Sequence, residues 1–587
     1  MPRRVRRILL IALAVVVALV GGAALAATLA LRGSLPRLDG ERALAGLQAP
    51  VTVTRDAFGV PDIAAAGRAD AARALGYVHA QDRFFQMDLQ RRTAAGELAR
   101  LLGPALVETD RDHRRHRFRS RARAVVAAAT GAERAVLLAY ADGVNAGLDD
   151  LRVRPWEYLV LRQRPEPWRP EDSMLTLYAM FLDLALSTAA TEEAWASVQA
   201  NLPASLAAFL LPAANRWDAP LEPGAPTPPA VPDSNVVDVR GWDAGVDLRQ
   251  GSGDAAPADT AGSNNWAVAG HLTADGGALV ANDMHLGLGL PNIWYRARMS
   301  WSEGAGRRAG VGVTLPGTPA LVAGSNGDVA WGFTNSYGDW VDLVVLETDT
   351  TDTARYLTPG GWKPFVTVTE VIRVAGGAPD TLTVTETVWG PVWTTDTAGR
   401  PLALRWTAHD ADAVNLSLMA LETARDVDEA VAAAAGAGVP PQNMVCGDST
   451  GRIAWTIAGR IPRRVGWDGR LPAAWADGRC RWDGYVAPAD QPRIVDPPEG
   501  RLWTANNRVT AGDNLAVIGD GGYGLGARAR QIRDGLRTLG RATVRDMLAL
   551  QLDDRAVFLG DWRDLILTVL ARREEDLLPR RADFLHA

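Results

Sequence analysis

The chain has 587 residues, with a charged share of 22% and a hydrophobic share of 47%, which are the proportions of an ordinary globular protein. Its 62 basic and 68 acidic residues give a formal net charge of −6, and the two signs are interspersed along the chain. This balance argues against a nucleic-acid-binding protein, and we expect no nucleic-acid partner. The length allows one large core or two to four domains.

The N-terminal segment, residues 1–32, has the charge and hydropathy pattern of a membrane anchor or a signal peptide. Four arginines, at positions 3, 4, 6 and 7, precede an uncharged run over residues 8–31. As a helix this run would be about 36 Å long at roughly 1.5 Å per residue, which is enough to cross a bilayer. The arginines favour a cytoplasmic N-terminus, so we expect a membrane-anchored protein whose bulk lies on the extracytoplasmic, periplasmic face. Ala24-Leu25-Ala26 offers a cleavage site, which leaves removal of a signal peptide open.

Two further features carry little functional signal. The basic cluster RDHRRHRFRSRAR, residues 111–123, is interpreted as a solvated helix face, and its histidines His113 and His116 only weakly suggest a metal site. The two cysteines, Cys446 and Cys480, would face an oxidising compartment if the bulk of the chain is exported. There they could form a disulfide, and two isolated buried thiols are an equally good interpretation.

The pattern along the chain predicts a helical front part and a strand-rich rear part. Residues 50–65 are typical of two short strands joined by a turn, and apolar residues then recur at helical spacing. Pro, Gly, Ala and Asp dominate residues 219–262, which we interpret as an exposed, removable linker. From there short strand patterns follow one another. The predicted boundaries are therefore 33–218 for the helical part, 219–262 for the linker and 263–587 for the rear part.

Ser263 stands where the linker ends and a strand begins, in AGSNNWAVAG. On its own, this stretch is a polar turn before a strand. A second serine, Ser449 in GDSTG, matches the G-x-S-x-G pattern of a conventional serine hydrolase. The strand-like RIAWTIAGRIP follows it where that motif needs a helix. We therefore interpret residues 447–451 as a hairpin turn.

The order of eight motifs resembles that of the penicillin acylase family of N-terminal-nucleophile (Ntn) hydrolases. The front part contains RDAFGVPDI and ALGYVHAQDRFFQMDLQRRTAAGELARLLG. The rear part contains GSNNWAVAG, NDMHLGL, PG-x-P followed by VAGSNGDVAWGFTNSYGDWVDL, GRIPRR, and WTANNR followed by ARARQIRDGL. Together the motifs cover most of residues 50–555. No single motif is decisive, but their shared order leaves little room for chance.

The resemblance implies an α+β fold of the Ntn-hydrolase type: an αββα sandwich with a mainly helical, alpha-chain-like front part, here preceded by the N-terminal transmembrane segment. It also implies an inactive precursor that cuts itself between Gly262 and Ser263, discards the linker and leaves alpha and beta chains. Ser263 would then act as nucleophile and base, because a free α-amine with a pKa of about 7.7–8.0 takes the hydroxyl proton near neutral pH. Gly262, which has no Cβ, would allow the strained backbone that self-attack needs.

The family's remaining catalytic positions carry over to four residues. His285 matches the position that steadies the new N-terminus, and members with histidine there resemble the cephalosporin, aculeacin and homoserine-lactone acylases more than the benzylpenicillin type. Asn335 matches the residue whose backbone N–H forms half of the oxyanion hole, and Asn506 matches the side-chain amide that completes it. Arg528 aligns with an arginine that orients this asparagine. Without the resemblance, a core histidine, two turn asparagines and a surface arginine would be the simpler interpretations.

The segment GDWVDL matches the family's calcium loop. Asp339 and Asp342 would bind the ion through their carboxylates and Val341 through its carbonyl, which are the oxygen ligands that a hard cation such as Ca²⁺ prefers. Glu192 or Glu193 of the front part would supply a further carboxylate. A solvated acidic turn without a metal is the alternative. The resemblance thus leads us to expect a structural Ca²⁺ ion.

The function implied by the resemblance is hydrolysis of the amide bond of an N-acylated small molecule through an acyl-enzyme on Ser263. The alternatives are an acyl-homoserine lactone acylase of the same family and, from a different class, an unprocessed and inactive binding protein at the membrane. One departure from the family pattern favours the last. Members continue well past the equivalent of LALQLDDRAVFLGDW, whereas this sequence stops at Ala587, so we expect residues 263–587 to be incomplete at the C-terminal end.

Overall fold

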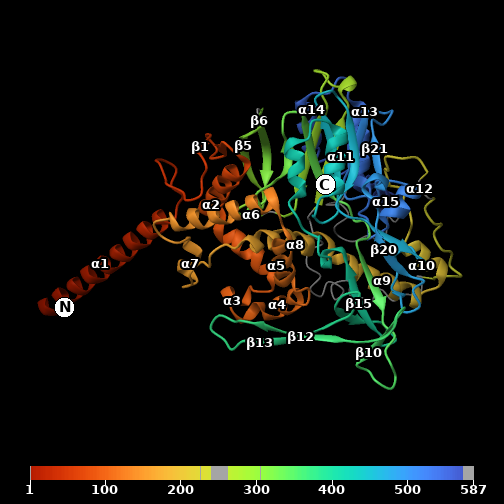
Figure 1. The fold of residues 1–587 in the computed structure, drawn as a ribbon, viewed down its shortest axis with the longest axis horizontal. Helices are drawn as coiled ribbons and strands as arrows, with labels where there is room; N and C mark the ends of the chain where they lie inside the picture. Colours follow the sequence, from red (N-terminus) through yellow and green to blue (C-terminus); the bar gives the residue numbers. More distant parts are fainter. Residues whose placement is uncertain (1, 225–226, 239–261, 288, 305, 573–587) are drawn as a thin grey trace.

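The computed structural model of the chain describes residues 2–224, 227–238, 262–287, 289–304 and 306–572. Helices of the front part lie beside a body of strands from the rear part, and the N-terminal helix α1 (Arg3–Gly33) projects away from both (Figure 1). The predicted mixture of helices and sheets is confirmed, with helices dominating the front part and strands following one another from Gly262 onward.

The helical part is organised around α2 (Arg68–Ala95) and α6 (Gly131–Asp149), which pack closely against each other. Glycine makes this approach feasible, because a Cβ at Gly76 would overlap the backbone of Tyr140. The other helices of this part are α3 (Ala99–Leu102), α4 (Val107–Arg114), α5 (Phe118–Ala128), α7 (Trp156–Val160), α8 (Pro170–Ala185), α9 (Ser187–Asn201) and α10 (Ala204–Leu210).

A nine-stranded sheet in the described part of the chain joins the front and rear parts. Its order is β1 (Thr52–Arg55), β2 (Pro61–Ala64), β5 (Tyr295–Glu303), β6 (Gly306–Thr314), β7 (Leu321–Ser325), β8 (Val329–Asn335), β16 (Gln442–Asp448), β17 (Ile453–Ala458) and β21 (Arg493–Val495). The predicted strand-turn-strand is the antiparallel pair β1–β2, and β2 continues the sheet by pairing in parallel with β5. The front part therefore contributes two strands to a sheet that the rear part completes.

A second sheet carries the Gly-Ser junction. Its order is β22 (Arg501–Thr504), β3 (Gly262–Val268) and β4 (Leu279–His285), and both pairings are antiparallel. Alternate residues of β3 face opposite ways, as the pleat requires. Trp266 belongs to a hydrophobic cluster that includes Ile532 of α13 (Ala527–Thr538), whereas Ala267 belongs to one that includes Trp455 of the nine-stranded sheet. The second sheet is thus held between a helix layer and the larger sheet.

The remaining strands form smaller units around β9 (Val341–Val345). On one side β9 pairs with β15 (Pro401–Trp406), and β15 in turn pairs with β14 (Val392–Thr395). On its other side β9 pairs with the short β19 (Ala473–Ala474). Two hairpins, β10 (Arg355–Thr358) with β11 (Gly361–Pro364) and β12 (Val366–Ile372) with β13 (Asp380–Glu386), complete the described set together with the antiparallel pair β18 (Pro462–Val465) and β20 (Arg481–Tyr485). The other rear helices are α11 (Val427–Ala435), α12 (Gly512–Ile518), α14 (Val544–Gln551) and α15 (Gly560–Arg572).

Two sequence interpretations in the rear part have clear outcomes. The hairpin turn at GDSTG is confirmed, because β16 ends at Asp448, β17 begins at Ile453 and the exposed Ser449 lies between them. The two cysteines do not form a disulfide: Cys446 is buried in β16 and Cys480 lies partly exposed near the start of β20.

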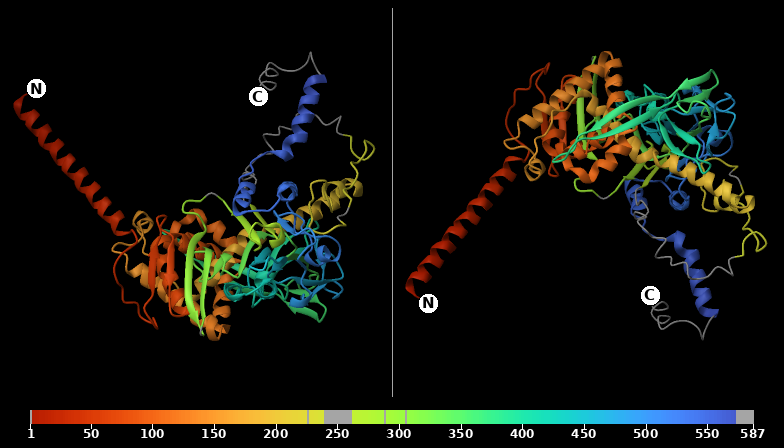
Figure 2. Two further views of the ribbon diagram at one scale, coloured as in Figure 1. Left: turned by 90° about the horizontal axis from the view of Figure 1, so that it is seen from above. Right: turned by 90° about the horizontal axis from the view of Figure 1, so that it is seen from below.

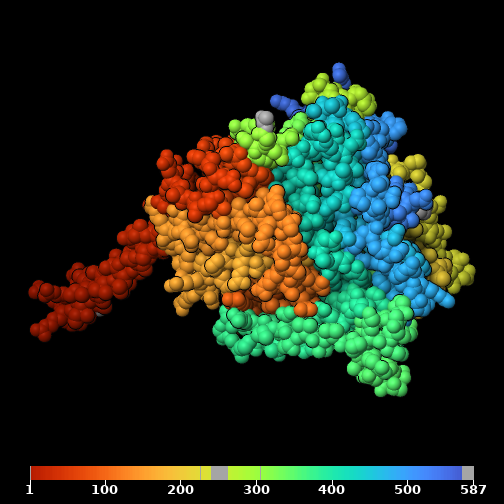
Figure 3. All heavy atoms as spheres, in the orientation of Figure 1, coloured from red at the N-terminus to blue at the C-terminus, as the bar shows by residue number. Residues whose placement is uncertain are grey.

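The interpretation of residues 111–123 as a solvated helix face is wrong. The cluster spans α4 and α5, and the hairpin β12–β13 lies along this edge of the helical part (Figure 3). Arg111 Nη1 lies 2.5 Å from Asp380 Oδ2 of the hairpin. His116 is buried, with its Nδ1 3.1 Å from Nε2 of His409. Arg111 and His116 therefore connect the front and rear parts, whereas Arg119 of the same cluster pairs within the front part, with Glu97 and Asp172.

The residues at the front of the predicted linker pack on the rear part. Ala219 is fully buried and its carbonyl accepts a 2.7 Å hydrogen bond from Trp503 Nε1. The backbone N–H of Leu221 donates to the carbonyl of Val509 at 2.8 Å. Residues 225–226 and 239–261 of the linker lie outside the described residues.

Two helices in the described residues are long and apolar enough to cross a membrane. One is α1, whose most apolar 18 residues have a mean hydropathy of 2.9, which has no buried residue, and which stands clear of the body (Figure 2). The other, Pro170–Asn201, comprises α8 and α9. Of its most apolar 18 residues, 56% are buried, as expected of helices in a protein core. Only α1 therefore retains the features of the predicted anchor or signal segment.

Candidate active site

Ser263 is the second residue of β3 and lies buried in the second sheet, with 2% of its surface exposed. It pairs with Met284 of β4, and Gly262 pairs with His285. The backbone N–H of Ser263 donates a 2.8 Å hydrogen bond to Oδ1 of Asn506. The predicted junction is thus already a regular strand, and its serine nitrogen is bound by the asparagine expected from the resemblance.

Asn506 connects three of the predicted residues. Its side-chain Nδ2 donates to the carbonyl of Asn335 at 2.9 Å. Its Oδ1 accepts a second hydrogen bond, 2.9 Å long, from Nη2 of Arg528, while Nη1 of the same guanidinium donates to the Ser263 carbonyl at 2.9 Å. Asn506 has φ of 62°, a left-handed conformation that asparagine adopts more readily than most residues. The structure therefore brings Ser263, Asn335, Asn506 and Arg528 together, and Arg528 holds the amide of Asn506.

His285 lies against the bond that precedes Ser263. A Cβ built at Gly262 would be 2.7 Å from His285 Nε2 and 3.2 Å from Nη2 of Arg528. On the other side of the ring, Nδ1 lies 3.3 Å from Oδ2 of Asp283. This contact with His285 lowers the pKa of the Asp283 carboxyl and favours its charged form. Glycine is the residue that leaves room for the imidazole at this position.

A pocket lined mainly by apolar side chains, which we call the apolar pocket, opens beside Ser263. Its volume is about 80 Å³, and the polar side chains among its lining residues are those of Ser263 and Gln442. Helix α8 contributes Leu177, Met180 and Leu184 to the lining, so the front and rear parts build the pocket together. A hydrocarbon group of modest size can lie there with its polar end at the serine.

The sequence model of the penicillin amidase family matches residues 50–586. The chain belongs to the penicillin amidase family. The prediction drawn from the eight motifs is confirmed. The chain is 35% identical to the penicillin acylase 2 proenzyme of Pseudomonas sp. (strain SE83), over 83% of this chain and 62% of that protein. It is 30% identical to the acyl-homoserine lactone acylase QuiP of Pseudomonas aeruginosa, over 90% of this chain and 63% of that protein.

A solved penicillin G acylase from Alcaligenes faecalis is also similar to this member of the penicillin amidase family. It has a TM-score of 0.46 and 22% identity, over 55% of this chain and 58% of that one. The chain spans about 62% of the length of the penicillin acylase 2 proenzyme.

The residues expected to bind calcium lie together where the two parts of this penicillin amidase family member meet. Glu192 of α9 is buried and its Oε2 accepts a 3.0 Å hydrogen bond from the backbone N–H of Leu343. Nη2 of Arg464 lies 2.8 Å from Asp339 Oδ1 and 3.0 Å from Asp342 Oδ2. Glu193, by contrast, is only partly buried, so Glu192 is the acidic residue that the structure directs toward the loop.

The single positive charge of Arg464 does not balance the three buried carboxyl groups of this cluster. Oε1 of Glu192 and both carboxylate oxygens of Asp339 are buried and accept no well-aligned hydrogen bond from the described residues, so the 2.8 Å contact of Arg464 with Asp339 Oδ1 is an ion pair without hydrogen-bond geometry. Burial raises the pKa of the Glu192 and Asp339 carboxyls well above the ordinary value, and the negative charge of Asp342 raises both further. Val341 is buried within β9. As the described side chains stand, they form no group of three or more acidic, histidine or cysteine residues that could hold a metal ion.

Sequence reasoning missed the polar side chains that join the two sheets beside Ser263. Asn282 of β4 donates from Nδ2 to the carbonyls of Asn264 (3.0 Å) and Phe333 (2.8 Å), and its Oδ1 accepts from the Phe333 N–H at 3.1 Å. Next to this bridge, the hydroxyls of Thr334 and Thr504 lie 2.9 Å apart. Each of these residues falls in a motif quoted above, Asn282 in NDMHLGL, Thr334 in WGFTN and Thr504 in WTANNR, and membership of these motifs was the available signal.

The close fit around Gly262 generates a test. Gly262→Val should force the His285 ring or the Arg528 guanidinium to move, and overpacking of this kind costs about 1–3 kcal/mol. Calorimetric unfolding of the uncut Ser263→Ala chain, with and without Gly262→Val, measures the loss of stability. Gly436→Ala is the matched control, because a Cβ there meets its nearest neighbour at 3.9 Å. An unchanged unfolding temperature for Gly262→Val would refute the fit.

Proposed function

We propose that the chain is the precursor of a self-processing amidohydrolase with an Ntn-hydrolase αββα core, whose nucleophile is Ser263. The observation that carries this proposal is the position of Ser263: its nitrogen is held by Asn506, and an apolar pocket opens beside it. Membership of the penicillin amidase family supports the same assignment. The reaction is hydrolysis of the amide bond of an N-acylated small molecule, which yields a carboxylic acid and an amine.

The first step is cleavage of the chain itself. Ser263 Oγ attacks the carbonyl carbon of Gly262, the carbon–nitrogen bond breaks as the serine nitrogen takes a proton, and an ester joins the two residues. Water then hydrolyses the ester, which leaves a carboxylate on Gly262 and a free amine on Ser263. His285 supports this step by position, because its Nε2 lies against Gly262.

In the mature enzyme the new α-amine of Ser263 replaces a separate base. With an ordinary pKa of about 7.7–8.0, a useful fraction of the amine is unprotonated near neutral pH and takes the hydroxyl proton. Asn506 Oδ1, which accepts from this nitrogen in the uncut chain, keeps the amine oriented. The Asn506 side-chain amide and the Asn335 backbone N–H are the proposed donors to the oxyanion, and Arg528 fixes the amide.

The apolar pocket indicates what kind of acyl group the substrate carries, but it does not identify the amine to which this group is attached. Its lining suits a hydrocarbon acyl group. A penicillin-type acylase and an acyl-homoserine lactone acylase both need such a pocket, and the chain is similar to proteins of both names. The lactone acylase is therefore the second candidate. The alternative from another class is an unprocessed, inactive binding protein.

Two substitutions at Ser263 distinguish the enzyme from the unprocessed binding protein. Ser263→Ala should remain one chain without activity, whereas Ser263→Cys should still cut, because a thiol is a competent nucleophile. The wild-type protein should appear as two chains in mass spectrometry, and N-terminal sequencing of the rear chain should read Ser-Asn-Asn-Trp-Ala. Ser449→Ala, at an exposed turn serine, is the matched control and should cut normally. A wild-type chain that stays intact, or that is cut elsewhere, would contradict the proposal.

We also propose that Ca²⁺ binds at Asp339, Asp342, Glu192 and the carbonyl of Val341. The residues fit a hard cation because buried carboxylate oxygens of Asp339 and Glu192 lack hydrogen-bond donors among the described residues. The ion would supply positive charge where one arginine faces three carboxylates. Arg464 is the competing explanation, since it already neutralises part of that charge.

Calcium titration tests whether Ca²⁺ or only the Arg464 guanidinium neutralises these carboxylates. Ca²⁺ should raise the unfolding temperature of the full chain, by the equivalent of about 2.7 kcal/mol at one hundred times its dissociation constant. Asp339→Asn combined with Asp342→Asn should abolish the increase, and Asp142→Asn, a substitution at an exposed carboxylate, should preserve it. No response in the wild-type protein, before and after treatment with a chelator, would leave Arg464 as the cation of the site.

Helix α1 is proposed to be a retained anchor that holds the body of the protein on the extracytoplasmic, periplasmic face. Its length, its exposure and the mean hydropathy of 2.9 over its most apolar 18 residues support this role, and so do the four arginines before its apolar run.

Extraction of membranes tests the anchor. The protein should stay in the pellet after washes with high salt and alkaline carbonate, and detergent should release it, because about thirty helical residues bury enough apolar surface to resist both washes. A periplasmic protein whose sequence begins near Ala27 would show instead that the segment is a cleaved signal.

A further inference from the structure

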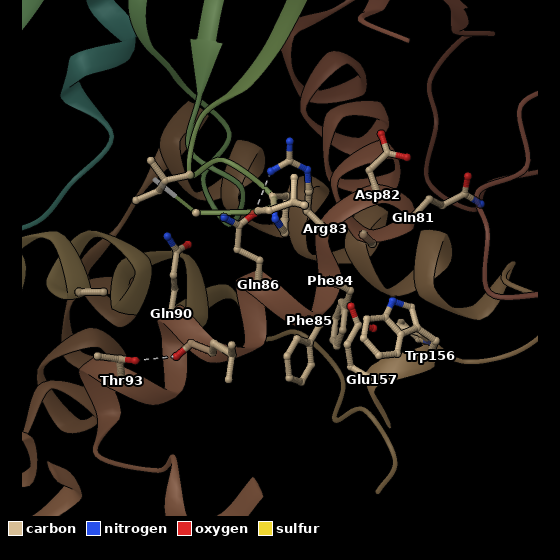
Figure 4. Close-up of a pocket in the computed structure, with 18 of the residues that line it drawn as sticks. Gln81, Asp82, Arg83, Phe84, Phe85, Gln86, Gln90, Thr93, Trp156 and Glu157 are labelled. Carbon is tan, nitrogen blue, oxygen red and sulfur yellow. Dashed lines mark hydrogen bonds between the residues drawn. The ribbon is translucent and has the colours of Figure 1, made fainter. Parts of the chain in front are cut away.

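A large cleft lies next to the apolar pocket, between α2, α7 and the segment 289–293. Its volume is about 1170 Å³. Figure 4 shows Phe85 of α2 and Trp156 of α7 at one end of the cleft and Gln86 and Gln90 of α2 farther along it. The proposed reaction does not explain a cavity of this size.

The inner end of the cleft meets the apolar pocket. Met180 of α8 and Leu286, which follows β4, line both cavities. These two side chains are therefore the partition between the cleft and the pocket that contains Ser263. Both are flexible hydrocarbon side chains without polar groups that need partners, so a hydrocarbon chain can pass between them without breaking hydrogen bonds.

The outer end of the cleft lies at the base of α1. Ser34, Leu35 and Pro36, the residues that follow this helix directly, line the cleft. Their position is fixed, because the N–H of Val153 donates to the carbonyl of Gly33 at 3.0 Å and the N–H of Arg37 donates to Gln81 Oε1 at 3.2 Å. If α1 spans a bilayer, the mouth of the cleft therefore lies at the membrane surface.

The rim of this mouth is apolar. Leu35 is 60% exposed, Trp156 of α7 is 49% exposed and Leu290 is fully exposed. Tryptophan and leucine at the level where a membrane helix leaves the bilayer suit the interface between lipid and water. Among the polar groups of the cleft, Arg83 is already bonded, because its Nη1 donates to the carbonyl of Asn292 at 2.5 Å, whereas the buried Oε1 of Gln90 has no hydrogen-bond donor among the described residues.

We propose that this cleft is the route by which an amphiphilic N-acyl substrate delivers its acyl chain from the membrane surface to Ser263. The substrate class is an N-acylated amine with an acyl chain long enough to partition into the bilayer, an equilibrium that rises about fourfold with each methylene group. Polar residues such as Gln86 and Gln90 share the lining, and the apolar residues Leu35, Phe85, Leu89 and Met180 give this chain an apolar surface to follow toward the pocket. The inference rests on the proposed amidohydrolase function and on retention of α1.

Photolabelling of the full chain in phosphatidylcholine vesicles tests the route. The probe is an N-dodecanoyl glycine amide with a diazirine at the end of the acyl chain, and Ser263→Ala keeps the probe intact. Mass spectrometry should find the label on Phe85, Leu89 or Trp156. Labelling should follow the mole fraction of the probe in the bilayer. A butanoyl analogue should label the apolar pocket instead, because its chain is too short to extend into the cleft.

Matched variants separate the cleft from nonspecific labelling. Leu89→Asp should lower labelling in the cleft at least tenfold, and Trp156→Asp, at a half-exposed position, guards against a folding defect of the first variant. Val544→Asp, at an exposed apolar residue of α14 outside the cleft, should change nothing. Labelling confined to the apolar pocket, insensitive to both cleft variants, or dependent on the aqueous concentration of the probe would overturn the proposal. Failure of the amidohydrolase assignment would show separately, as a wild-type chain that is never cut before Ser263.

Discussion

The hydrogen bonds of the Asn506 amide set the geometry on which the rest of the site depends. One end of the amide accepts from the Ser263 nitrogen and from Arg528, and the other donates to the Asn335 carbonyl. A planar amide with both ends bonded cannot rotate without breaking at least one of these contacts. The left-handed backbone of Asn506 aims the group at both strands, and the surrounding hydrogen bonds offset the cost of that conformation.

The Asn506 amide can position β3 and β8 relative to each other only if the two sheets that contain these strands do not slide past each other. Asn282 and the Thr334–Thr504 contact prevent such movement, since they bond β4 and β22 to β8 on either side of Ser263. These side chains lie in the interior between the sheets, where Asn443 also donates to Thr334 and where an unpaired polar group would cost roughly 1–3 kcal/mol. Any shift of one sheet against the other would unpair them. The polar bridges therefore make the relative position of the serine and Asn335 a property of the whole sandwich.

Sequence patterns predicted what depends on local spacing and shared motifs. They placed the hairpin at Ser449, the strand at Ser263 and the residues that the structure brings together around it. They failed where the partner is distant along the chain. The arginines of 111–123 looked solvated because their acidic partners, such as Asp380, come from a hairpin more than two hundred residues away. The contact of Arg464 with Asp339 also joins residues that are far apart in sequence, 125 positions, and so was invisible to a motif that placed only the carboxylates.

The uncut chain already contains the arrangement that the mature enzyme would use. Gly262 is paired in β3, the serine nitrogen is bonded to Asn506, and the apolar pocket is formed by residues of both parts. Cleavage would therefore add no contact to the catalytic network. What it changes is chemical: an amide nitrogen, which is not basic, becomes an amine that takes a proton near neutral pH. Folding would position the site and cleavage would supply its base, which is why the junction must be both a regular strand and a position where no Cβ crowds the His285 ring.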